Sequence, residues 1–249
     1  MDLINIPQLR FPRFFVNGEL TVGGQAVITN SDAKHICTVL RMKPGEKVVL
    51  CSDDGYEYPS EIIFVQENCV RFTVLVKRPN DTEPGIYVRL FQCMPKGDKL
   101  DTVVQKATEL GVSEIIPVIS KRCMSKPHKN SNKINRLKKI AEHAAKQSGR
   151  GIIPQIHEFM SFNDAIHLYN KDNPGVIFYE NGGKRINEIV KNNTNIDVFV
   201  GCEGGFDAAE IEAAVNAGFV RASLGKRILR TETAPIAAIA ILMNITGDI

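Results

Sequence analysis

Residues 196–218 read IDVFVGCEGGFDAAEIEAAVNAG, and this stretch indicates the class of fold. The apolar run 196–200 predicts a buried strand. Asp207 is followed three residues later by Glu210, the pattern of a capping box that opens a helix, and Gly218 is placed to end that helix. A glycine-rich loop joins the strand to the helix. A strand that passes through a short loop into a helix is the repeating unit of an α/β domain.

The same alternation extends through the second part of the chain. Apolar runs of strand length alternate with segments in which apolar residues recur at helical spacing. The predicted strands are 86–93, 114–119 and 175–179, and the predicted helices are 98–110, 135–148 and a segment opened by Ser161 with Asp164. A chain that alternates in this way folds into an α/β domain with a mainly parallel sheet.

The first part of the chain has a different rhythm. Short apolar runs follow one another between turn signals such as Asn17-Gly18, which predicts a small β-barrel. The predicted strands are 13–16, 47–51, 61–65 and 69–76. One helix interrupts them, capped by Ser31 or Asp32 and running to Leu40.

Residues 78–85 separate the two rhythms, because this segment has two prolines and no periodicity. The chain has 249 residues, of which 43% are hydrophobic, enough for a small domain and a medium one. We therefore predict two domains, a barrel over residues 1–76 and an α/β domain over residues 77–249.

Composition excludes several classes of protein. The net charge is only +3, so any surface that binds nucleic acid must be a local patch. The start of the chain lacks the pattern of a secretory signal, and the apolar stretch 234–243 is about half of the roughly 20 residues that a membrane span needs. The six cysteines stand singly, with no metal-ligand spacing. We expect a cytoplasmic protein with no membrane partner and no metal.

Three loops follow predicted strands and are candidates for a ligand site, because ligands bind at the carboxyl ends of parallel strands. They are 180–183, 201–206 and 224–233. The middle loop has three glycines, which would let the backbone approach a flat ligand, although a tight turn has the same composition. No GxGxxG or GxxxxGK[ST] pattern is present, so a dinucleotide or ATP is not supported. An adenosyl ligand without phosphates fits better.

The end of the chain combines a basic loop with an apolar helix. Leucine and isoleucine alternate with Lys226, Arg227 and Arg230, so the loop could wall an adenine, or its arginines could simply be solvated. Residues 235–245, PIAAIAILMNI, are apolar nearly all round. Such a helix must be buried on every side, either as a core helix or at a homodimer interface.

Six segments occur in the same order as in a known family. They are FPRFF, HICTVLRMKPGE, KGDKLDTVVQKATELGVSEIIPV, AKQSGRGIIPQI, GCEGGF and LGKRILRTETA. With them the chain resembles the RsmE family of 16S ribosomal RNA uridine N3-methyltransferases, of the SPOUT superfamily. The resemblance covers nearly the whole chain. It implies a PUA-like RNA-binding barrel, an α/β SPOUT domain with a trefoil knot, a homodimer, and methyl transfer from S-adenosylmethionine to a uridine of 16S ribosomal RNA.

The resemblance also implies where the cofactor binds. The implied cofactor residues are Tyr179, Glu180, Gly201, Cys202, Glu203, Gly204, Gly205, Leu224, Gly225, Ile228, Leu229 and Arg230. The family usually has proline where this chain has Cys202 and Lys226. These departures leave open an alternative, a catalytically silent protein that binds ribosomal RNA or assists ribosome assembly.

Catalysis at a uracil N3 needs placement of the methyl group, loss of a proton, and stabilisation of charge on the base. Arg230 is the candidate for charge stabilisation, and its alternative role is to hold the loop by pairing with Glu203 or Glu232. Glu232 is the nearest candidate for a general base, and water is the alternative.

Contacts to 16S ribosomal RNA, free or in the assembled small subunit, are expected from basic residues of both domains. The candidates are Arg13, His35, Arg41, Lys121, Arg122, Lys138, Lys139 and Arg150. Arg13 stands among phenylalanines that could stack on bases or form barrel core. Lys121 and Arg122 open a basic run that continues through Lys126, His128 and Lys129 to the lysines at 138 and 139. Such a run can also be a solvated face.

Overall fold

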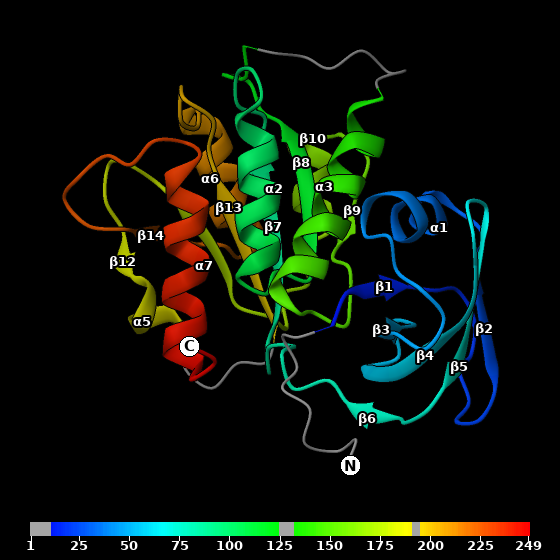
Figure 1. The fold of residues 1–249 in the computed structure, drawn as a ribbon. Coiled ribbons are helices and arrows are strands. Elements are labelled where there is room, and N and C mark those ends of the chain that lie inside the picture. Colours follow the sequence, from blue (N-terminus) through cyan, green and yellow to red (C-terminus); the bar gives the residue numbers. More distant parts are fainter. Residues whose placement is uncertain (1–10, 125–131, 191–194) are drawn as a thin grey trace. The chain divides into compact units, whose positions relative to one another are not determined.

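The structure is a computed structural model that describes residues 11–124, 132–190 and 195–249 (Figure 1). The chain divides into two compact units. Unit 1 contains residues 1–83 and 145–153, and unit 2 contains residues 84–144 and 154–249. The linker after residue 76 and a short later segment therefore group with the N-terminal strands. The domain boundary between residues 76 and 77 stays a prediction.

Unit 1 is a curled, mostly antiparallel sheet with one short helix. Its strands are β1 (Arg13–Phe15), β2 (Gln25–Ile28), β3 (Lys47–Cys51), β4 (Tyr56–Gln66), β5 (Cys69–Val74) and β6 (Arg78–Pro79). They follow the order β1-β3-β4-β5-β2, and β6 pairs with β4. The four predicted strands are confirmed, and β2 was not predicted. Phe14, Tyr58 and Phe72 pack in the core of this sheet, so the aromatic residue after Arg13 is core and not a stacking platform.

The predicted helix of unit 1 is shorter and begins differently from the prediction. Helix α1 (Ser31–Lys34) continues into a π-helical turn over His35–Val39. Its cap is Asn30, whose side chain accepts a hydrogen bond from the backbone N–H of Asp32. The prediction that Ser31 or Asp32 is the cap was therefore wrong. Asp32 instead accepts an ion pair from Lys146, with 2.8 Å between Nζ and Oδ1.

A buried charge cluster holds β1, β4 and β6 together. The Glu57 carboxylate is fully buried and receives hydrogen bonds from Arg13, at 2.8 Å, and from Arg78. The Arg13 side chain is only 3% exposed. This corrects the prediction that Arg13 contacts RNA, because its guanidinium is already used inside unit 1.

Unit 2 is an α/β domain in which all strands of the sheet are parallel. Its strands are β7 (Tyr87–Cys93), β8 (Glu114–Ile119), β9 (Gln155–Ile156), β10 (Met160–Ser161), β11 (Gly175–Phe178), β12 (Lys184–Arg185), β13 (Asn195–Val200) and β14 (Val220–Ser223). The order is β10-β8-β7-β13-β11-β14-β12, with β9 beside β8. Every pair is parallel. The predicted α/β class with a mainly parallel sheet is thus confirmed, and the trefoil knot stays a prediction.

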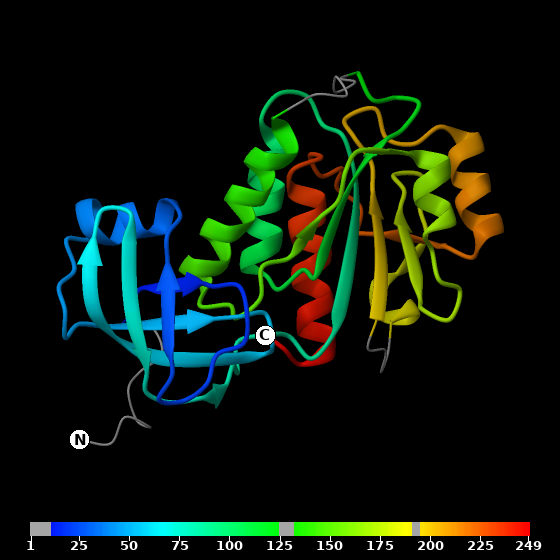
Figure 2. The ribbon, with the colours of Figure 1, turned by 90° about the vertical axis from the view of Figure 1, so that its right-hand side faces the viewer.

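Helices lie on both faces of this sheet. They are α2 (Lys99–Glu109), α3 (Lys133–Ser148), α4 (Phe162–His167), α5 (Ile186–Ile189), α6 (Ala208–Ala217) and α7 (Thr233–Thr246). Figure 2 shows α2 and α7 together on one face and α4 with α6 on the other. The capping box of Asp207 with Glu210 and the Gly218 end of α6 are confirmed, and Gly218 has a φ of 118° that favours glycine.

Helix α7 is buried along one side only. Ala238, Ile239 and Leu242 are fully covered, whereas Ile241 is 37% exposed. The expectation of burial all round is therefore not met within one copy of the chain. In the described residues, no helix is long and apolar enough to cross a membrane.

The buried cluster gives a test of unit 1. Replacement Glu57→Ala leaves two arginines without their carboxylate, one of them buried, and should lower the free energy of unfolding by about 3 kcal/mol. Glu61→Ala is the matched control on the same strand, because the exposed pair of Glu61 with Lys47 should contribute about 1 kcal/mol or less. Urea unfolding measures both. Equal losses would contradict the structural role of the cluster.

Candidate functional site

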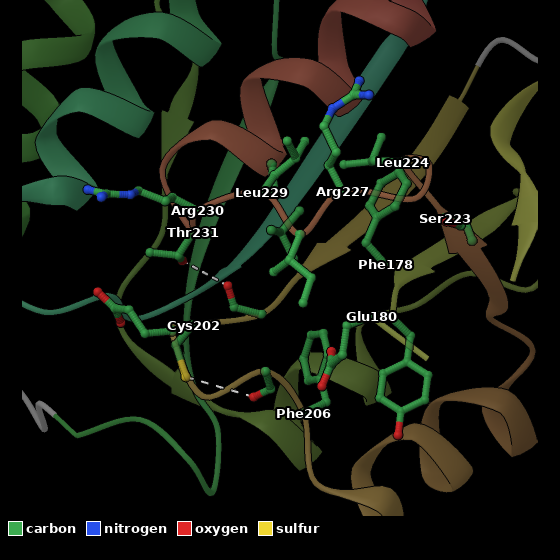
Figure 3. Close-up of a pocket in the computed structure, with 18 of the residues that line it drawn as sticks. Phe178, Glu180, Cys202, Phe206, Ser223, Leu224, Arg227, Leu229, Arg230 and Thr231 are labelled. Atoms are coloured by element: carbon green, nitrogen blue, oxygen red, sulfur yellow. Dashed lines mark hydrogen bonds between the residues drawn. The ribbon is translucent and has the colours of Figure 1, made fainter. Parts of the chain in front are cut away.

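A cavity of about 550 Å³ opens at the carboxyl ends of β11, β13 and β14. The lining comes from the three loops that follow these strands (Figure 3). All twelve residues predicted to hold a cofactor lie in this lining. The structure therefore brings together residues that span 52 positions, from Tyr179 to Arg230. Their role as ligands stays a prediction.

The middle loop forms a tight turn whose glycines line the cavity. A turn is closed by a hydrogen bond from the Gly205 N–H to the Cys202 carbonyl, at 2.9 Å. Gly205 has a φ of +64°, and a Cβ atom there would lie 2.8 Å from a carboxylate oxygen of Glu180. A Cβ atom on Gly201 would crowd Gly205 and Phe206. A side chain at these glycines would therefore disturb the loop.

Neighbouring segments fix the loop from two sides. The Thr231 hydroxyl donates to the Gly201 carbonyl at 2.9 Å, which joins the third loop to the second. Arg122 donates to the Gly204 carbonyl at 3.0 Å. These contacts hold the backbone in place before any ligand arrives, which lowers the cost of ordering on binding.

The walls of the cavity are largely apolar. Phe178, Val200 and Phe206 lie at or beside the strand ends, and Leu224 with Leu229 comes from the third loop. Figure 3 shows Leu224 close to Phe178. Apolar walls with exposed backbone groups suit a flat heterocycle.

Lys99, which sequence reasoning missed, forms the charged edge of the cavity. Its ammonium lies 2.9 Å from Oε1 of Glu203 and 3.4 Å from Oε2 of Glu232. The Glu203 carboxylate also accepts from the Lys96 backbone N–H at 3.1 Å. Burial raises the pKa of Glu203, but these donors outweigh it and leave the pKa below its usual value. The only sequence signal for Lys99 was the segment KGDKLD, in which no role was assigned to it.

Arg230 does not hold the loop, so its predicted alternative role was wrong. Lys99 makes both of the contacts that were considered for Arg230. The Arg230 side chain is exposed, and Figure 3 shows its guanidinium directed away from the centre of the cavity. Glu232, the candidate base, does not belong to the cavity lining.

The residues predicted to contact RNA differ in burial and in whether their charges are paired. The Arg150 side chain is 4% exposed and pairs with Glu83 at 2.8 Å, so we assign it a structural role in unit 1. Lys121 pairs with Asp207, and Arg122 is bound to the glycine loop. The candidates that are exposed and, among the described residues, form no ion pair are His35, Arg41, Lys138 and Lys139. Lys126, His128 and Lys129 lie outside the described residues.

Comparisons with known proteins agree with this geometry. Residues 82–243 match the RNA methyltransferase domain family, and residues 28–75 match the RNA methyltransferase PUA domain. Ribosomal RNA small subunit methyltransferase E of Bacillus subtilis is 34% identical over 226 residues, covering 86% of this chain and 88% of the relative.

Solved structures extend the similarity to three dimensions. The Neisseria gonorrhoeae ribosomal RNA small subunit methyltransferase E, bound to S-adenosylmethionine, is 31% identical with a TM-score of 0.89, covering 95% of this chain and 98% of that one. A methyltransferase of Legionella pneumophila, also with the bound cofactor, is 29% identical with a TM-score of 0.87, covering 94% and 98%.

Replacement Lys99→Met tests the charged edge. Loss of the ammonium should raise the pKa of Glu203 toward its usual value, which carbon-detected NMR titration of the carboxylate measures. Because the folded-state pKa is lowered, the pair stabilises the protein above the unfolded pKa and loses this effect as the pH falls. Lys106→Met is the control on the same helix, since Lys106 pairs with Glu109. An unchanged Glu203 pKa in Lys99→Met would contradict the contact.

Proposed function

The chain belongs to the RNA methyltransferase family, and from this membership we propose that it transfers a methyl group from S-adenosylmethionine to N3 of a uridine in 16S ribosomal RNA. The observation that carries the proposal is the glycine-lined cavity at three strand ends. Its residues lie within the span matched by the methyltransferase family, and solved relatives with bound S-adenosylmethionine have the same fold.

The cavity fits the adenosyl group. Backbone groups of the loop from Gly201 to Gly205 are accessible because these glycines lack side chains that would cover them, and Leu224 with Leu229 would lie against the adenine. We propose that the twelve lining residues named from the resemblance hold the cofactor, Arg230 through its backbone and not through its guanidinium. When bound, the cofactor supplies a methyl group activated on a sulfonium. The Cys202 and Lys226 departures leave this backbone geometry formed.

Arg230 is our candidate for the residue that assists the reaction. Its guanidinium is exposed at the rim and, in the described residues, has no ion-pair partner, so it is free to turn toward a base placed at the cavity mouth. There it would donate hydrogen bonds to the uracil carbonyl as negative charge develops. Glu232 is held by Lys99 outside the lining, and we therefore propose that water takes the N3 proton.

We also propose how the chain assembles and which role each domain has. We propose that a second copy of the chain covers the exposed side of α7, where Ile241 stands without cover. Residues 1–76 would help to hold ribosomal RNA, and residues 77–249 would carry the reaction. The reaction would take place in the cytoplasm, on free 16S RNA or on the small subunit.

A methylation assay tests the function. The protein is incubated with deuterium-labelled S-adenosylmethionine and with ribosomal RNA or small subunits from cells that lack this gene, and the digested RNA is analysed by mass spectrometry. We expect one labelled 3-methyluridine. A folded protein that binds both cofactor and RNA but adds no label would favour the silent RNA-binding alternative. If the folded protein does not bind S-adenosylmethionine in calorimetry, the assignment of the cavity is contradicted.

In the same assay, Arg230→Ala separates chemistry from binding. We expect kcat to fall by about 10²-fold, the usual effect of removing one donor to a developing oxyanion. The Kd for S-adenosylmethionine should stay within about twofold, because Arg230 points away from the cavity. Equal losses of kcat and cofactor affinity would make Arg230 a residue of the cofactor site alone.

A further inference from the structure

Five cations gather along one edge of the parallel sheet and the loop beside it. They lie on β12, on β14 and in the loop after β14. This basic edge consists of Lys184, Arg185, Arg221, Lys226 and Arg227. All five side chains are exposed. Within the described ranges, none of them forms an ion pair or a side-chain hydrogen bond.

The strand register makes the basic edge continuous with the cavity. β12 is the last strand of the sheet and pairs with β14, so that Arg185 stands beside Ser223. Ser223 lines the cavity, as do Lys226 and Arg227. Paired residues of parallel strands face the same side of the sheet, so Arg185 faces the same side as Ser223. Arg221 stands two positions before Ser223 on β14 and therefore lies on this same face.

A glycine brings the two strands of the basic edge together. A Cβ atom on Gly183 would lie 2.6 Å from the backbone of Arg221. Any other residue would push β12 away from β14 and separate Lys184 and Arg185 from the cavity. The close approach therefore serves to place these cations beside the cavity.

Several other basic residues of unit 2 differ because their charges are already used in ion pairs. Arg136 pairs with Asp98 and Asp101, and Lys121 pairs with Asp207. Acidic residues are few at the basic edge. The Glu180 carboxylate lies against Gly205 in the glycine loop. Glu188 on α5, three residues after Arg185, is an exposed carboxylate near the basic edge in sequence. The edge therefore keeps a net positive charge next to the site of reaction.

We propose that the basic edge binds the phosphates of the RNA strand whose uridine enters the cavity. The inference rests on the proposed function, which makes RNA the substrate. Arginine and lysine are the side chains that bind phosphate groups, and contacts of this kind fix the position of a strand without reading its sequence. The edge would thus set which way the RNA strand runs across the cavity mouth.

The test compares two variants with equal loss of charge. The first carries Lys184→Gln, Arg185→Gln and Arg221→Gln, three residues outside the cavity lining. The second carries Lys47→Gln, Lys106→Gln and Lys171→Gln, three lysines that belong neither to the basic edge nor to the predicted RNA contacts. Binding of a fluorescent 16S RNA fragment is measured by anisotropy at several salt concentrations. Removing one cation that binds a phosphate should lower the magnitude of the slope of log K against log salt by about 0.7 to 0.9, hence by about 2 to 3 in total for the first variant.

Binding of S-adenosylmethionine in calorimetry shows that each variant is folded and should be unchanged. If the first triple variant does not fold, Arg185→Gln and Arg221→Gln are measured singly. The proposal is overturned if RNA affinity and slope in the basic-edge variant match the wild type, or if the slope falls as far in the control variant as in the basic-edge variant. Because binding is read without methyl transfer, RNA that binds through the edge but is never methylated would contradict the proposed function alone.

Discussion

The structure of the site depends on one constraint, the close packing around Gly201, Gly204 and Gly205 in the turn after β13. There the chain must turn within a few residues of the end of β13 while Glu180 and Phe206 lie against it. Thr231 and Arg122 bind the carbonyls of this turn and so tie two further segments to it. The cavity is a consequence of these approaches, and a Cβ atom at Gly201 or Gly205 would disturb them.

Local patterns allowed much of the fold to be predicted. Helix α6 was predicted from its cap and its terminal glycine, and β8 from its apolar run, because such signals act within a few residues. The cavity lining was also predicted, since it follows from a general rule on the ends of parallel strands together with the resemblance to a family. Strand β2 and the two-residue β12 were missed because short strands depend on their partners.

The errors share a physical cause, which is that a charge shows its role only with its partner. Arg13 meets Glu57 at a separation of 44 positions, and Arg150 meets Glu83 at 67. Both arginines looked like RNA contacts, and both are buried in ion pairs. Lys99 and Glu203 are 104 positions apart, so no local pattern could have assigned that pair.

We propose that three loops at the ends of β11, β13 and β14 hold the adenosyl group. A crystal structure of this protein grown with S-adenosylmethionine would test the position of the cofactor. We expect density for the adenosyl group between Glu180, Gly205 and Leu229, with the loop backbone unchanged. Density for the cofactor at another place, or a glycine loop that changes conformation to admit it, would show that the cavity is wrongly assigned.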